Sequence, residues 1–290
     1  MKTIIKNGRL ITPDGIIDGY ILYEDGKITE TGTGDCMPQA DEVIDAQGRY
    51  VSPGFIDIHT HGAGGADYMD GTLEAYLTAA RMSARHGATL VYPTTLTSSN
   101  EVLFDTFDLY EQAVAANTEG AAFGGLHLEG PYFNPKQAGA QDPRYLKNPD
   151  PEEYMDIMRR TEGRVARWSL APELPGAHDM ARALKARGVL MAYGHTDASF
   201  EECEDAFNAG FTHMTHFFSG MSTVSRNGIY RRAGAVEYGY YNDDVTVELI
   251  GDGIHVPASM LKMTYKIKGA DNIALVTDSI RAAGLPDGKY

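Results

Sequence analysis

Two histidines separated by a single residue close a short apolar segment near the start of the chain. The segment is Phe55–His61, and His59 and His61 stand at its end, before a glycine-rich stretch. Side chains alternate between the two faces of a strand, so the two imidazoles point the same way. Neutral imidazoles at the end of a buried strand pack poorly in a core but are good metal ligands. The sequence therefore predicts half of a metal site here, if other segments supply the remaining ligands.

The segments that must position such ligands alternate in type from Gly54 onward. Short apolar runs are separated by segments with helical patterning, which is typical of βαβ units in a parallel sheet. The predicted strands are Phe55–His61, Thr89–Thr95, Phe123–Glu129, Arg167–Pro172, Leu190–His195, His213–Phe218, Val245–Ile250 and Ile273–Asp278. The predicted helices include Leu73–His86, Glu101–Asn117, Asp179–Arg187 and Phe200–Ala209. This pattern predicts an α/β fold, a (β/α)8 barrel of the TIM type, with its functional site at the carboxyl ends of the strands.

The residues at the predicted strand ends test this fold independently of any motif. Histidines and carboxylates stand there, namely His59, His61, Glu129, His195, His216 and Asp278. A single histidine is more often a hydrogen-bonded core residue than a ligand, but six such residues at matching ends are hard to obtain by chance. The set therefore predicts a functional rim.

The other histidines divide into structural and functional candidates. His86 and His178 lie at predicted helix ends, and His213 opens its predicted strand at the opposite end of the barrel, so we interpret all three as structural. His127 shares a face with Glu129 one layer deeper, which favours support of a ligand over ligation. His255 follows the seventh strand on the functional rim, and a contact with substrate is favoured there.

Composition limits the class of protein. The chain has 290 residues, of which 43% are hydrophobic and 22% charged, as in a globular protein with a sizeable core. Its net charge of −15 argues against sequence-independent binding to nucleic acid. There are only two cysteines, Cys36 and Cys203, and no apolar segment of membrane-spanning length, so we expect a cytoplasmic protein without disulfides.

The first 50 residues differ from the rest. Short strand-like runs separated by Asn-Gly and Asp-Gly turns predict a small β-sandwich unit over residues 1–50, followed by the barrel over residues 51–290.

Five sequence blocks in fixed order carry a family resemblance. They are PGFIDIHTHG, LHLEGPYFNP, GHT, THFF and VTDS. Together they resemble the amidohydrolase superfamily, and within it the family of N-acetylglucosamine-6-phosphate deacetylases, whose HLEGP block is fairly diagnostic. The resemblance implies metal-dependent removal of the N-acetyl group from N-acetylglucosamine 6-phosphate, which gives glucosamine 6-phosphate and acetate.

The resemblance also implies a ligand set and a catalytic residue. His59, His61 and Glu129 would hold one divalent metal, and Glu129, His195 and His216 the other. Some members keep only the second metal, so one or two ions are expected, with zinc favoured over iron or manganese. Asp278 matches the catalytic aspartate, which takes a proton from water and returns it to the departing amine.

The substrate contacts implied by the resemblance are Ala140, Gln141, Ser219, Gly220, Arg231 and His255. Here the chain departs from many relatives. Gln141 replaces a histidine, Ser219 and Gly220 replace an asparagine-alanine pair, and Arg231 stands in an Arg-Arg-Ala-Gly block instead of Arg-Glu-Pro-Gly. By this resemblance phosphate binding is assigned to Arg231, with Arg226 and Arg232 as the other candidates. The alternative is that these arginines belong to a solvated basic loop that binds no phosphate.

Two further expectations follow from the resemblance. Relatives are homodimers in which the phosphate-binding arginine reaches into the partner's site, so a homodimer is expected. Relatives also continue past the catalytic aspartate to complete the β unit, so the chain is interpreted as a fragment whose activity is open.

Two alternatives to this function stay open. Ser219 and Gln141 suggest hydrolysis of another N-acylated sugar phosphate, and the interpretation as a fragment suggests a truncated barrel that only binds a ligand.

Overall fold

The computed structural model describes residues 1–34 and 37–289, which leaves Cys36 outside the described residues. They form two compact units, Met1–Phe55 and Ile56–Tyr290. The division falls close to the one expected from the change in sequence pattern after residue 50.

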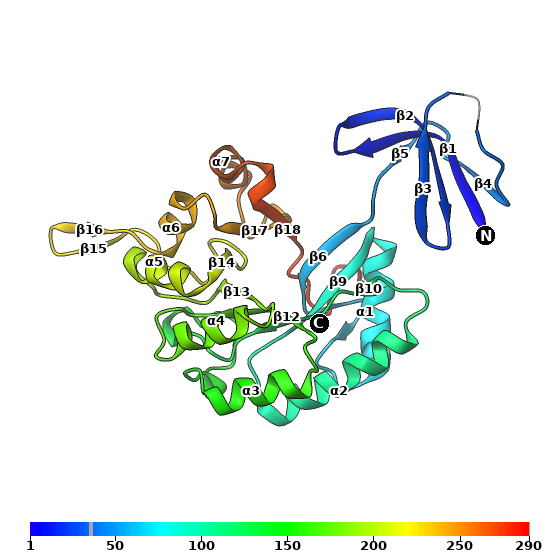
Figure 1. The fold of residues 1–290 in the computed structure, drawn as a ribbon. Coiled ribbons are helices and arrows are strands. Elements are labelled where there is room, and N and C mark those ends of the chain that lie inside the picture. Colours follow the sequence, from blue (N-terminus) through cyan, green and yellow to red (C-terminus); the bar gives the residue numbers. More distant parts are fainter. Residues whose placement is uncertain (35–36, 290) are drawn as a thin grey trace. The chain divides into compact units, whose positions relative to one another are not determined.

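The N-terminal unit is a small β-sheet (Figure 1). Its strands are β1 (Lys2–Thr12), β2 (Gly15–Glu24), β3 (Lys27–Gly32), β4 (Glu42–Asp45) and β5 (Tyr50–Val51). The order is β3-β2-β1-β4, and β5 pairs with a later part of β1 than β4 does. Alternation places Ile4, Tyr20 and Leu22 on one buried face. Within the described residues of this unit there is one sheet, without the second layer of a sandwich.

The second unit is built on eight parallel strands, which confirms the predicted barrel. They are β6 (Phe55–Thr60), β9 (Ala88–Thr95), β11 (Leu126–Glu129), β12 (Val165–Leu170), β13 (Leu190–Tyr193), β14 (Phe211–Met214), β17 (Thr246–Ile250) and β18 (Ile273–Val276). They pair in chain order. The ring closes between the first and last strands, where Asp278 N donates to His59 O at 2.9 Å and His61 N to Ser279 O at 2.8 Å.

One predicted strand is interrupted. The run Phe123–Glu129 appears as β10 (Ala122–Phe123) and β11, separated by Gly124 and Gly125. Gly125 has φ +134°, a conformation that favours glycine, so the strand breaks at this point.

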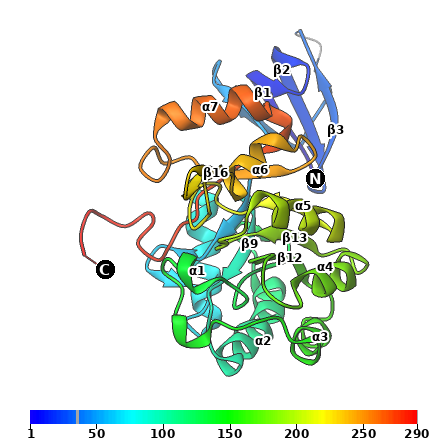
Figure 2. The same cartoon turned by 90° about the vertical axis from the view of Figure 1, so that its left-hand side faces the viewer.

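Helices follow the strands and surround them. They are α1 (Leu73–Arg85), α2 (Asn100–Ala116), α3 (Pro151–Arg160), α4 (Ala177–Lys185), α5 (Phe200–Ala209), α6 (Ala235–Tyr241) and α7 (Ala258–Lys268), with short 3-10 turns at Pro135–Gln137, Pro143–Tyr145 and Ala270–Asn272. In Figure 2 strands β9, β12 and β13 lie at the centre with α1 to α6 around them. None of the described helices combines the length and apolar character that crossing a membrane requires.

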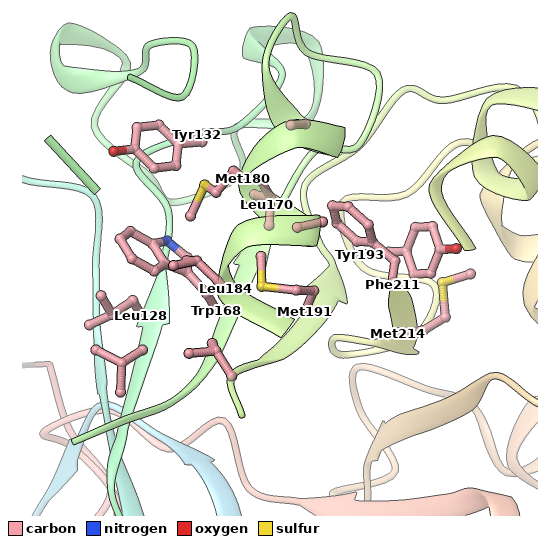
Figure 3. Close-up of a cluster of buried hydrophobic side chains, with 14 of the residues drawn as sticks. Leu128, Tyr132, Trp168, Leu170, Met180, Leu184, Met191, Tyr193, Phe211 and Met214 are labelled. Carbon is pink, nitrogen blue, oxygen red and sulfur yellow. The ribbon is translucent and has the colours of Figure 1, made fainter. Parts of the chain in front are cut away.

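Alternation along the barrel strands separates the core from the site. Leu128 and Trp168 face the helices and gather with Met180 and Leu184 of α4 in a buried apolar cluster (Figure 3). Their sequence neighbours therefore point into the barrel, and this interior is polar: Nε2 of His127 lies 2.7 Å from Ser169 Oγ. The strands thus present apolar residues outward and polar residues to one another.

Two small hairpins extend from the barrel. They are β7 (Gly62–Ala63) with β8 (Ala66–Asp67), and β15 (Ser225–Asn227) with β16 (Tyr230–Arg232). The second hairpin projects away from the ring of strands in Figure 1. On another face, apolar residues of α7 and β18 line a groove of about 740 Å³, in which Leu275 is 68% exposed.

Candidate metal and catalytic site

Four histidine side chains converge on one buried glutamate at the carboxyl ends of the strands. Nε2 of His195 and of His216 lie 3.0 and 2.9 Å from Glu129 Oε1. Nε2 of His61 lies 3.3 Å from Glu129 Oε2, and Nε2 of His59 lies 3.8 Å from Oε1. We call the group His59, His61 and Glu129 site A, and the group Glu129, His195 and His216 site B; the ligand atoms of each lie within 4.8 Å of one another.

The strand ends turn these side chains into the barrel mouth through unusual backbone geometry. His195, His216 and Asp278 have φ values of 45°, 28° and 48°. Positive φ is uncommon for residues other than glycine, and it persists where surrounding structure enforces it, often at functional sites. Here three of the predicted site residues share it, each two residues after the end of a barrel strand.

The second ring nitrogen of three of these histidines is already bonded. Nδ1 of His59 lies 3.0 Å from Glu248 Oε2, that of His61 3.2 Å from Thr94 O, and that of His195 2.7 Å from Gln137 O. A carbonyl or carboxylate oxygen accepts only, so each Nδ1 donates and Nε2 is the nitrogen left for a metal. Nε2 of each ring faces Glu129, as that of a metal ligand should.

The donor set fits a divalent metal in both groups. Nε2 of His59 is buried and has no hydrogen-bond partner in the described part of the chain. Nε2 of His195 and Nε2 of His216 lie only 3.1 Å apart. At that separation both nitrogens can be ligands of the same ion. Imidazole nitrogens with one carboxylate form a ligand set that suits zinc and related metals.

The electrostatics of the site keep its carboxylates charged. Burial alone would raise the pKa of Glu129, but hydrogen bonds with His195 and His216, together with the nearby rings of His59 and His61, hold it well below its usual value. Asp278 behaves alike: burial acts to raise its pKa, and the charge of His59 and a hydrogen bond from His61 lower it. Both groups are therefore ionised at neutral pH.

Asp278 lies beside site A. Its Oδ1 is 3.2 Å from His61 Nε2 and 3.4 Å from His59 Nε2. The side chain is 21% exposed, so one edge of the carboxylate reaches the mouth of the barrel while the other faces the ligands. A base in this position can accept a proton from a water molecule held at the ligands.

A buried charged layer beneath the ligands was absent from the sequence prediction. Glu248 of β17 is fully buried, and it accepts hydrogen bonds from Arg167 and from His59 and contacts His213. His213 therefore lies within the barrel, not at its opposite end as predicted, because β14 begins earlier, at Phe211. The sequence signal that could have revealed this layer is a charged residue within an apolar strand run, as at Arg167 and Glu248.

His127 takes the supporting position that its spacing suggested. Its ring stacks edge to face on His59 with centroids 4.6 Å apart, and its nitrogens lie 3.1 Å from Thr94 Oγ1 and 2.7 Å from Ser169 Oγ. Both nitrogens are occupied, so the ring packs behind His59.

Gln141 contacts the central glutamate. Its Nε2 donates to Glu129 Oε2 at 3.0 Å, and its Oε1 accepts from Thr97 N at 2.7 Å. The side chain is 4% exposed, whereas the neighbouring Ala140 is exposed. The amide is therefore engaged with the protein on both sides, with one N–H left for a further contact.

Gly220 lies directly behind His195, and its neighbour Ser219 turns back on His216. Thr196 N donates to Gly220 O at 2.9 Å, and Ser219 N to His216 O at 2.9 Å. A Cβ at Gly220 would lie 3.0 Å from His195 Nδ1, and φ is +58°. This position therefore requires glycine for two reasons.

The other predicted substrate residues lie apart from the ligands. Arg226 and Arg231 face each other across the β15–β16 hairpin, and Arg232 follows on the same strand. His255 is exposed, with its Nδ1 2.7 Å from Asp252 Oδ2. Among the described residues, none of these side chains has a recorded contact with site A or site B.

Comparison with known proteins places these observations in a family. The amidohydrolase family model matches residues 50–286 of the chain. A Bacillus subtilis (strain 168) protein named N-acetylglucosamine-6-phosphate deacetylase is 33% identical over 99% of this chain and 73% of its own length. An Escherichia coli O157:H7 protein named N-acetylgalactosamine-6-phosphate deacetylase is 31% identical over 100% of this chain and 74% of its own.

A solved structure is similar over the same extent. It is a mutant N-acetyl-D-glucosamine-6-phosphate deacetylase from Mycobacterium smegmatis in complex with N-acetyl-D-glucosamine-6-phosphate. The TM-score is 0.87 at 28% identity, and the match covers 99% of this chain and 73% of the other.

Proposed function

This chain belongs to the amidohydrolase family, and from that premise we propose that it removes the N-acetyl group of N-acetylglucosamine 6-phosphate by metal-dependent hydrolysis. The products are glucosamine 6-phosphate and acetate. One observation carries the proposal: Glu129 is shared by two histidine groups, and Asp278 lies beside one of them. Relatives named for this reaction over nearly the whole chain support it. They also favour it over a different sugar phosphate or a barrel that only binds a ligand.

Divalent metal would be held by the residues of sites A and B. We propose that two ions would be held, one by each site with Glu129 as a residue of both, and zinc as the metal, with iron or manganese as alternatives. A bound ion would lower the pKa of a water molecule and polarise the acetamide carbonyl. The chain's own contribution is to hold Nε2 of each histidine toward Glu129, through the hydrogen bonds at Nδ1 of His59, His61 and His195.

Asp278 is the proposed proton carrier. Its Oδ1 would accept the proton of the attacking water and then deliver it to the departing amine nitrogen, so that one carboxylate acts as base and then as acid. The lowered pKa of Asp278 supports the first half of this role, because the group must be ionised to accept the proton.

Phosphate recognition is proposed for the β15–β16 hairpin. Arg226 and Arg231 are opposite each other, an arrangement of like charges that is unfavourable on its own. A phosphate would relieve the repulsion and match the planar guanidinium groups. We propose Arg231 as the main contact, with Arg226 and Arg232 as the next candidates. The proposed remaining contacts are Ala140, Gln141, Ser219, Gly220 and His255.

The projecting hairpin supports a homodimer in which Arg231 serves the partner's site. Ile229 at its tip is 83% exposed, and Arg231 contacts neither ligand group in the described part of its own chain. Mixing an Asp278→Asn chain with an Arg231→Ala chain tests this. If Arg231 acts across the dimer, the mixture of two weak variants should recover about a quarter of wild-type activity. No recovery would place Arg231 within its own chain's site.

Acetate release tests the function itself. The metal-loaded chain is expected to hydrolyse N-acetylglucosamine 6-phosphate in preference to N-acetylglucosamine and to N-acetylgalactosamine 6-phosphate. A preference for the unphosphorylated sugar would remove Arg231 from its role, and no acetate from any of the three would contradict the proposal. The compartment we propose is the cytoplasm, consistent with the buried free thiol of Cys203.

A further inference from the structure

The buried carboxylate of Glu248 lies beneath both ligand groups. It is fully buried at the centre of the barrel and has four polar partners. A buried carboxylate is costly unless it is fully paired, so its retention at this position calls for a physical role.

The two oxygens of Glu248 have different partners. Oε1 contacts Arg167 and lies 3.3 Å from His213 Nε2. Arg167 also donates to Ile58 O at 3.1 Å. Oε2 accepts from Nδ1 of His59 at 3.0 Å and from the backbone N of His216 at 2.8 Å. One oxygen is therefore held by the barrel interior, and the other by a ligand of site A and a ligand of site B.

These contacts have different consequences at the two sites. The bond to His59 fixes the ring through its side chain and so directs Nε2. The bond to His216 fixes only the backbone, at a residue whose φ of 28° needs external support. His59 has no other hydrogen bond to its ring, because its Nε2 has no partner among the described residues.

We infer that Glu248, anchored by Arg167, is a positioning residue that orients His59 and thereby sets the affinity of site A for divalent metal. The inference rests on the metal centre in the proposed function. Its consequence is selective: loss of the carboxylate weakens site A more than site B, because His195 and Glu129 of site B have orienting bonds elsewhere.

The test is metal binding by the full chain, measured as zinc content per chain over a series of buffered free zinc concentrations. Glu248→Gln is expected to lower the affinity for one of the two zinc ions by about 10- to 100-fold, the usual effect of losing a hydrogen-bond partner of a metal ligand. His61→Ala and His195→Ala identify which ion is affected. His213→Gln is the matched control, since it alters the Oε1 side of the same network and leaves the bond to His59.

The double variant Arg167→Met with Glu248→Gln is used if the single variant fails to fold, because it removes both charges and leaves no unpaired guanidinium. It is also expected to lose site A selectively. Equal zinc affinity in folded Glu248→Gln or double-variant chains and in the wild type would overturn the inference, as would an equal loss in His213→Gln. A wild-type chain that binds no zinc would overturn the metal centre as well, which separates the two failures.

Discussion

At the scale of single residues, the site depends on the different roles of the two nitrogens of an imidazole: one bonds to the protein and the other faces the ligand group. Nδ1 of His61 and of His195 donate to backbone oxygens, and Nδ1 of His59 to a carboxylate. Each bond fixes the ring with Nε2 directed at Glu129. The protein thereby sets the orientation of a ligand before any metal binds, which lowers the reorganisation that binding would require.

Asp278→Asn is expected to lower kcat by about 10²- to 10⁴-fold, the usual contribution of a general acid–base group. The amide cannot accept the proton from water, yet it has the same shape and leaves His59 and His61 in place. Zinc content should therefore stay at the wild-type value. Acetate release and metal analysis on the same sample check both parts, and unchanged turnover would rule out the proton-carrying role.

Gln141→Leu is expected to lower kcat by about 10-fold through Glu129, because it removes a donor to the carboxylate and leaves Thr97 N without its acceptor. Gln137→Leu is the control, since that amide bonds Asp197 instead and its backbone bond to His195 remains. If Gln141 acted only on substrate, KM would rise while kcat and zinc affinity stayed the same. A kinetic and metal-binding comparison of the two variants distinguishes these outcomes.

At the scale of elements, the barrel strands deliver the ligands and the turns after them aim the side chains. Site B combines the ends of β11, β13 and β14, and Asp278 follows β18. Site residues after β13, β14 and β18 take positive φ, so the chain turns sharply as it leaves the sheet. The loop after β14 then returns Gly220 to the back of His195.

Gly220→Ala is expected to destabilise the chain and to weaken zinc binding at site B. The left-handed backbone alone costs about 1–2 kcal/mol for a residue with a Cβ, and the new atom would press on His195 Nδ1. Gly228→Ala is a matched control, because Gly228 has φ +63° and a Cβ added there would meet nothing within 4 Å. Thermal melts should show a loss of stability in both variants, but zinc titration should change only for Gly220→Ala. Equal zinc affinity in the two would show that His195 tolerates the contact.

At the scale of the whole molecule, the site connects parts of the barrel that are distant in sequence. His59 lies near the end of the first strand and closes against Asp278 after the last one, while Glu129 links both to His195 and His216. Metal bound there would tie several strands together, so binding and folding stability are coupled.

Removal of metal should make stability depend on pH. In the metal-free chain, burial acts to lower the pKa of His61, but hydrogen bonds with Asp278 and Glu129 outweigh it and raise the pKa from 6.5 to about 9. A folded-state pKa above the unfolded one gives stability that is fully present below about 6.5 and is lost as pH rises through about 9. The loss is on the order of 3 kcal/mol.

Thermal melts of the chelated chain across this window check the prediction, with His61→Gln as the control. The melting temperature of the chelated wild type should fall as pH rises, and that of His61→Gln should fall less. The zinc-loaded chain should show the opposite trend, because metal binding requires neutral imidazole and so strengthens as pH rises. A flat profile for the chelated wild type would contradict the assigned hydrogen bonds.

The sequence predicted much of this fold, and its errors have identifiable causes. Each of the eight predicted barrel strands has a counterpart in the structure, one of them interrupted, and the predicted limits of α5 match, because period-two and helical patterns are local properties. Glu248 and Arg167 were missed because their partners are up to 189 residues away in the chain. His213 was assigned to the wrong end because strand limits depend on pairing with neighbouring strands, which the local pattern does not contain.

The sequence by itself determined which residues could do chemistry and on which rim of the barrel they stand. Alternation and the rule that parallel strands end on one side suffice for that, so His59, His61, Glu129, His195, His216 and Asp278 could be named in advance. Only the tertiary structure decided how these groups are oriented. The bonds at Nδ1 of three imidazoles, the engagement of Gln141 with Glu129 and the buried support from Glu248 depend on distances between strands, and such distances are set by packing, not by spacing along the chain.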